Sequence, residues 1–250
     1  MEWYLYPAVV AAGFLCGFIN TLAGSGSLIT LPLLIFLGLD ANVANGTNRV
    51  AILLQNVVGV TRFHQKGLLK FKRALLLAAP AVIGAVIGAR IAVDLDEPTM
   101  RKVIGGLMVV MLIVLLVRPK RWLQGRPEQM QKTGWLQMLI FFGIGIYGGF
   151  IQAGVGIFLL TGLVLSAGYD LVRANAVKVL IILCFTAFAL VVFVINGQVR
   201  WLIGLILALG NMAGAWVAVH TAAERGATFV RGLLIAVVVI SAIVLLGGLA

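Results

Sequence analysis

Two positively charged side chains, Arg49 and Lys178, lie inside long apolar stretches of the sequence. A lone cation within a membrane costs at least about 2.5–3.5 kcal/mol on insertion scales, so it must face a partner or a wet cavity. Each is only a few residues from the start of its stretch, so snorkelling to the membrane surface is the alternative. No Asp or Glu lies deep within an apolar stretch. The two cations therefore favour binding of a small anion.

Glycine-rich breaks provide a second feature suited to anions. Gly24-Ser25-Gly26 and Gly154-Val155-Gly156 each precede a short apolar stretch of about 11 residues, or about 17 Å of helix, which cannot cross a membrane unaided. We expect a helical hairpin at each break. The N-terminus of each short helix then carries free N–H groups and about half a positive charge. Close helix packing or a flexible turn is the alternative role of these glycines.

These features predict a substrate site between the two hairpins, without catalytic residues, metal or cofactor. The sequence contains no zinc-ligand pattern, nucleophile elbow or phosphate loop, so we do not expect an enzyme. The residues predicted to bind the anion are Gly24, Ser25, Gly26, Ser27, Thr47, Asn48, Arg49, Gly154, Gly156, Asn175 and Lys178.

The elements that position these residues occur twice. The pattern of Gly, Asp and Asn returns without a gap after about 130 positions. Lys178 then matches Asn48, one place from Arg49, so the two cations occupy corresponding parts of the two halves. A duplicated apolar unit with glycine breaks at matching positions is typical of a transporter with a central site.

Composition places the chain in a membrane, because 62% of its residues are hydrophobic and 11% are charged, against about 45–50% and 25% in soluble proteins. We predict an all-α polytopic protein with a first repeat at 1–117, a basic cytoplasmic linker at 118–133 and a second repeat at 134–250. The predicted apolar stretches are Trp3–Ala23, Ser27–Leu37, Ala44–Arg62, Ala74–Val93 and Val103–Val117, then Trp135–Ala153, Ile157–Ala167, Ala174–Val194, Trp201–Thr221 and Phe229–Leu249.

Lys and Arg residues set the predicted orientation. The 62–73 loop and the 118–133 linker each contain five of them, and basic loops stay in the cytoplasm. The repeat partner of the first loop, at 196–200, has only Arg200. The two halves are therefore expected to be inverted relative to each other, with both termini on the periplasmic side. The net charge of +11 then reflects orientation and predicts no nucleic-acid partner.

Several segments resemble the sulfite exporter TauE/SafE family of membrane permeases. They are Gly13-Phe14, Leu22-Ala23-Gly24-Ser25-Gly26-Ser27, Leu31-Pro32-Leu33-Leu34, Ala44-Asn45-Gly46-Thr47-Asn48-Arg49 and Gly149-Phe150-Ile151-Gln152-Ala153-Gly154-Val155-Gly156. The resemblance covers essentially the whole chain. Ser25 and Ser27 interrupt a glycine run that is often denser in the family, which leaves the substrate open.

The resemblance implies transport of sulfite, sulfonates or related small anions across the bacterial inner membrane. We expect a secondary transporter that works by alternating access between the two halves. An anion channel, or a carrier for another small carboxylate or oxyanion, is the alternative. The expected partners are the anion and the lipid bilayer; homo-oligomer formation stays open.

Overall fold

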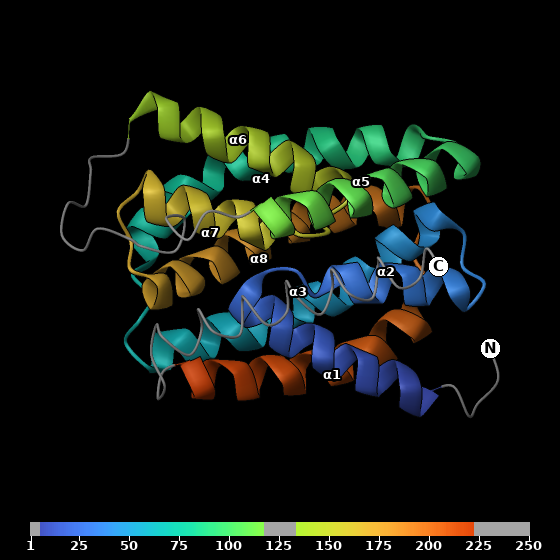
Figure 1. Cartoon of the computed structure of the whole chain (residues 1–250), viewed down its shortest axis with the longest axis horizontal. Coiled ribbons are helices and arrows are strands. Elements are labelled where there is room, and N and C mark those ends of the chain that lie inside the picture. Colours follow the sequence, from blue (N-terminus) through green and yellow to red (C-terminus); the bar gives the residue numbers. More distant parts are fainter. Residues whose placement is uncertain (1–5, 118–133, 223–250) are drawn as a thin grey trace.

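The structure is a computed structural model that describes residues 6–117 and 134–222. Within these ranges the chain is helical and contains no strand (Figure 1). The first half contains α1 (Tyr6–Ala23), α2 (Ser27–Phe36), α3 (Ala41–Gln65), α4 (Phe71–Asp94) and α5 (Glu97–Val117). The second half contains α6 (Trp135–Phe150), α7 (Val155–Leu165), α8 (Leu171–Ile195) and the Trp201–Ala222 helix.

The duplication predicted from sequence recurs in the backbone. α3 and α8 are both 25 residues long and begin at corresponding positions. Six glycines of the described residues have positive φ, and they form three pairs at the repeat spacing: Gly24 with Gly154, Gly38 with Gly168, and Gly67 with Gly197. In Figure 1, α1 runs from right to left, whereas its counterpart α6 runs from left to right.

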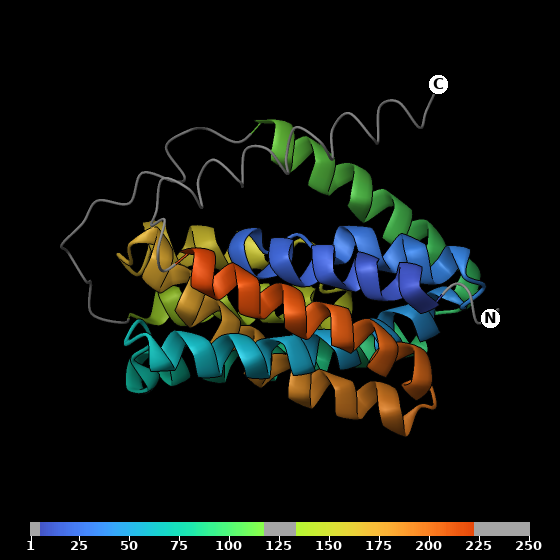
Figure 2. The ribbon, with the colours of Figure 1, turned by 90° about the horizontal axis from the view of Figure 1, so that it is seen from below.

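The two halves are intertwined, because the fourth helix of each half packs on the first helix of the other. Gly84 and Gly88 of α4 lie directly against the backbone of α6, and Gly210 and Gly214 of the Trp201–Ala222 helix lie against α1. A side chain at any of these positions would overlap with a neighbouring carbonyl, so small residues permit the close approach. Figures 1 and 2 both show the Trp201–Ala222 helix beside α1.

This exchange of helices produces two groups that meet across the centre of the molecule. We call α1, α2, α3 and the Trp201–Ala222 helix the first group, and α4, α6, α7 and α8 the second group. The main contact between the groups joins α3 to α8. Helix α5 lies at the edge of the molecule and contacts α3 (Figure 2).

The two predicted glycine breaks meet where the groups join. Gly24 ends α1 with φ +77°, and Gly154 precedes α7 with φ +71°, a conformation that glycine adopts without strain. A Cβ atom on Gly24 would overlap with Gly156, and one on Gly156 would overlap with Gly24. The hairpin tips are therefore in direct backbone contact, which explains the need for glycine at this place.

The hydrogen bonds between loops divide them between the two ends of the molecule. At one end, Arg73 at the start of α4 donates to the Ala167 carbonyl after α7, at 3.2 Å. At the other end, Gln198 donates to the Val93 carbonyl and Asn42 to the Leu95 carbonyl, at 3.1 and 2.6 Å. The 66–70 connection and the end of α7 therefore share one end, and the 94–97 and 196–200 connections share the other.

The helices generally begin or end a few residues from the predicted stretches. Helix α3 starts at Ala41 rather than Ala44, and α6 ends at Phe150 rather than Ala153. Asp170 caps α8, because its carboxylate accepts from the N–H groups of Val172 and Arg173 at 3.1 and 2.9 Å, whereas Asp40 makes no such bond at α3. The predicted linker 118–133 and stretch Phe229–Leu249 lie outside the described residues.

Four described helices are long and apolar enough to cross a membrane: α1, α4, α8 and the Trp201–Ala222 helix. Helix α4 shows how such a helix divides its surface between lipid and the rest of the protein. Ile83, Ile87 and Ile91 form an exposed apolar stripe, suited to contact with lipid. Most of its alanines and both of its glycines are buried among the neighbouring helices. Helix α3 is equally long but carries buried polar side chains, and it lies between other helices.

We predict that Gly156→Ala destabilises the protein, because the added methyl group forces the two hairpin tips apart. Overpacking of this kind typically costs about 1–3 kcal/mol. The measurement is the midpoint of thermal unfolding of the purified protein in detergent. The control is Gly105→Ala in α5, where a Cβ has no neighbour within 4 Å and alanine favours the helix by up to about 1 kcal/mol. Equal midpoints for the two variants would contradict the tip contact.

Candidate substrate site at the centre of the bundle

Arg49 of α3 is fully buried and binds the end of α6, in the other half of the chain. Its Nη1 donates to the Gly148 carbonyl at 3.1 Å, and its Nη2 donates to the Gly149 carbonyl at 2.5 Å. The guanidinium also lies over the Phe193 ring, 4.6 Å from its centre, an attractive cation–π contact. Asn45, one turn earlier, donates to the Phe150 carbonyl at 2.7 Å. Together, Arg49 and Asn45 satisfy the last carbonyls of the broken helix.

Lys178 of α8 makes the corresponding contacts with the end of α1. Its ammonium group donates to the carbonyls of Asn20 and Thr21 at 3.0 and 2.7 Å. It also donates to Oδ1 of Asn175 at 2.8 Å. An ammonium group has three donors, so all three are used.

Each cation therefore caps the end of a helix that belongs to the opposite half of the chain. We call these two interactions the crossed caps. The end of a helix leaves carbonyls without intrahelical partners and carries about half a negative charge. A buried cation needs compensation, and so do these carbonyls, because neither has water to bind in a membrane interior. Arg49 and Lys178 are 0% exposed, so they do not snorkel to the membrane surface.

All eleven residues predicted to bind substrate are buried. The glycines and serines of the first break and the glycines of the second lie at the two hairpin tips. Asn45 and Asn175, which the repeat relates, each lie beside a cation. Thr47 points elsewhere, because its hydroxyl accepts from the Arg200 N–H at 2.9 Å, at the start of the Trp201–Ala222 helix.

Several donors near this centre have no partner among the described residues. They are Nε of Arg49 and the side-chain amide nitrogens of Asn48 and Asn175. A buried donor without a partner costs about 1–3 kcal/mol. No carboxylate of the described residues pairs with Arg49 or Lys178, since the ion pairs found there are Arg90–Asp94, Arg101–Glu97 and Arg173–Asp170. Positive charge with spare N–H donors suits an anion.

A second set of buried polar side chains contains Asn48, which was predicted from the sequence to bind the anion, and five residues that were not predicted. It comprises residues of all four helices of the first group and is named here the polar cluster: Cys16, Asn20, Thr30, Asn48, Gln55 and Asn211. The sequence contains a signal for it, because each is a polar or weakly polar residue that interrupts an apolar stretch. Apart from Asn48, these residues lie outside the motifs that the two halves share, so the repeat does not point to them.

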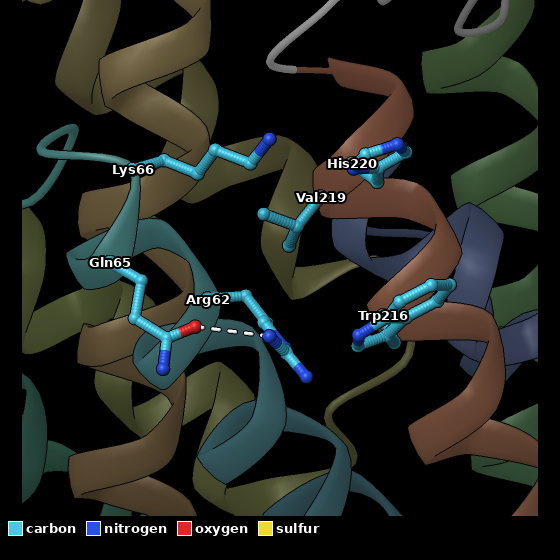
Figure 3. Close-up of a pocket in the computed structure, with 6 residues that line it drawn as sticks. All are labelled: Arg62, Gln65, Lys66, Trp216, Val219 and His220. Atoms are coloured by element: carbon cyan, nitrogen blue, oxygen red, sulfur yellow. Dashed lines mark hydrogen bonds between the residues drawn. The ribbon is translucent and has the colours of Figure 1, made fainter.

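A surface pocket of about 120 Å³ lies at the predicted cytoplasmic end, away from the hairpin tips. Figure 3 shows its lining, with side chains from the end of α3 facing those of the Trp201–Ala222 helix. Arg62 lies over the Trp216 ring at 5.6 Å and donates to Gln65 at 3.1 Å. His220 stacks on Trp216 with 6.0 Å between ring centres. None of the predicted substrate residues lines this pocket.

Several known proteins similar to this chain are named as membrane transporters, which agrees with the apolar helices of the fold. The chain is 28% identical to a probable membrane transporter protein, ORF9, of a Sinorhizobium species, over 98% of this chain and 94% of that protein. It is 23% identical to a probable membrane transporter protein of Haemophilus influenzae, with 92% and 90% covered. It is 25% identical to the probable membrane transporter protein YfcA of Escherichia coli K12, with 89% and 82% covered. No solved structure matches the chain.

The family description "Sulfite exporter TauE/SafE" matches residues 9–245, which include both hairpins and both buried cations. The predicted resemblance is therefore confirmed over nearly the whole chain. This protein belongs to the sulfite exporter TauE/SafE family of membrane transporters.

Proposed function

We propose that this membrane transporter is a secondary carrier that moves a small anion, such as sulfite or an organosulfonate, across the bacterial inner membrane. The observation that carries the proposal is the crossed capping at the centre of the molecule. Two buried cations and three unpartnered N–H donors lie around the hairpin tips, and no described carboxylate neutralises the cations. A bound anion supplies the missing negative charge.

Within this proposal, the two halves are inverted-topology repeats. The opposite directions of α1 and α6 in Figure 1 and the three glycine pairs at the repeat spacing support this arrangement. The hairpins then enter from opposite faces, and both termini lie on the periplasmic side. The predicted residues other than Thr47 form the substrate site, where Arg49 contacts the anion through Nε and Lys178 contributes its charge.

Alternating access follows from the two-group architecture. The first and second groups rock about the contact between Gly24 and Gly156, so that the site faces each side of the membrane in turn. The crossed caps join the groups while they move, since each cation belongs to one group and its carbonyls to the other. An inside-negative potential favours exit of an anion by about 2.3 kcal/mol per charge per 100 mV, so export needs no coupling ion.

A substrate panel tests this function. Purified protein is heated with sulfite, thiosulfate, sulfoacetate, taurine or simple carboxylates, and the compounds that raise the unfolding midpoint are assayed for flux in proteoliposomes. We expect a sulfur oxyanion or sulfonate to stabilise the protein and to be transported. Transport of carboxylates alone would exclude the proposed substrate class, and currents far above carrier turnover would indicate a channel.

The crossed caps lead to a second prediction, that Arg49→Ala abolishes anion flux. The variant loses the positive charge and leaves the Gly148 and Gly149 carbonyls without their partner. Arg49→Lys keeps the charge but not the planar donors and should retain partial flux. The control is Arg90→Ala, which removes an exposed cation of α4 that pairs with Asp94. Normal flux by folded Arg49→Ala in proteoliposomes would remove Arg49 from the site.

Inversion of the halves is tested at two positions that the repeat relates, Lys66 and Asn196, both exposed. Each is replaced by cysteine in a variant that lacks Cys16 and Cys184. We expect a membrane-impermeant thiol reagent to label Asn196→Cys in intact cells and to label Lys66→Cys only after permeabilisation. Labelling of both from the same side would contradict the inverted arrangement.

A further inference from the structure

The polar cluster connects the four helices of the first group by hydrogen bonds. Asn20 and Asn211 both donate to Oε1 of Gln55, at 3.4 and 3.2 Å. Thr30 donates to Oδ1 of Asn48 at 2.8 Å, and the Cys16 sulfur lies 3.7 Å from the Thr30 hydroxyl. Each of these side chains is at most 5% exposed.

The second group has no equivalent of this cluster at the positions that the repeat relates. Its buried Gln152–Thr186 hydrogen bond, at 2.6 Å, lies at other positions. The residues at the corresponding repeat positions form an almost entirely apolar set, with Lys178 as the exception. In the order of the polar cluster, these counterparts are Ile146, Phe150, Leu160, Lys178, Phe185 and Ala81.

Helix packing alone does not require the polar cluster. Asn211 lies where the Trp201–Ala222 helix crosses α1, and its counterpart Ala81 lies where α4 crosses α6. Both crossings bring backbones together through glycines, at Gly17 in one and Gly145 in the other. Because Ala81 is sufficient for close packing of α4 on α6, the amide group of Asn211 is not needed for packing and has another role. Buried polar groups in membrane proteins commonly mark a substrate path.

The bonding pattern indicates which ligand the cluster suits. Two amide N–H groups converge on one neutral oxygen, both at or beyond the long end of the usual range of 2.7–3.2 Å. The Asn48 amide nitrogen has no partner among the described residues. An anionic oxygen accepts such donors more strongly than a neutral carbonyl does. The cluster adjoins the crossed caps, because the Asn20 carbonyl accepts from Lys178.

We propose that the polar cluster of the first group is an oxyanion-binding segment of the transport path, and that the repeat-related positions of the second group provide no such segment. This inference rests on the proposed function and extends it. The amide groups of Asn20, Asn48 and Asn211 donate to the oxygens of a sulfite or sulfonate group as it enters or leaves the centre. The substrate path is therefore asymmetric, although the fold is duplicated.

The test measures half-saturation concentrations for sulfite and sulfoacetate flux in proteoliposomes, together with the thermal stabilisation that each anion produces. Asn211→Ala installs the residue that already packs at the counterpart position, and Thr30→Val keeps the side-chain shape without the hydroxyl. The control is Gln137→Leu, which removes a buried hydrogen bond from α6 to the Ser166 carbonyl, outside the polar cluster.

We expect Asn211→Ala to raise the half-saturation concentration at least about tenfold, as for one lost hydrogen bond to a charged group. Thr30→Val should raise it by a smaller factor, but more than about twofold, because it removes the hydroxyl that positions the Asn48 amide and not a donor to the anion. Both should also lose stabilisation by the anion, whereas Gln137→Leu should change only the unfolding midpoint. Values within twofold of the wild type for folded cluster variants would overturn the inference and leave the transport function intact. If Asn211→Ala does not fold, Thr30→Val decides alone. A wild-type protein that transports neither anion would overturn both proposals.

Discussion

The structure depends on the pairing of two buried cations with two broken helix ends. A break at the tip of a hairpin exposes carbonyls to an interior without water, and a cation in the same place lacks solvation. Arg49 and Lys178 solve both problems, since each binds the carbonyls of the opposite half. The pairing therefore connects the two groups of helices and concentrates charge at their junction.

This constraint explains why so much of the chain is glycine. The tips must touch for the cations to reach across, and Gly24 and Gly156 permit that contact. The exchanged fourth helices must also approach closely, which the glycines of α4 and the Trp201–Ala222 helix allow. Because dispersion and short polar contacts rather than hydrophobic burial hold helices together in lipid, close approach is the main source of cohesion.

The duplication sets the framework of the fold, and two features depart from it. The paired cations, positive-φ glycines and hairpins occur in both halves. The polar cluster and the basic 62–73 loop occur in one half only. The first departure lies inside the first group, where we propose that it binds the anion, and the second lies at the surface, where its basic residues predict the orientation in the membrane.

The sequence by itself determined the membrane class, the duplication and the place of both breaks, because hydropathy and glycine spacing are local properties of the chain. It left open whether Arg49 and Lys178 snorkel to the membrane surface, and the structure buries both. Only the tertiary structure decided which groups the cations bind. Arg49 lies 99 positions from Gly148, and Lys178 lies 158 from Asn20. Contacts at such separations follow from how the halves intertwine. The polar cluster likewise becomes a unit only when α1, α2, α3 and the Trp201–Ala222 helix come together.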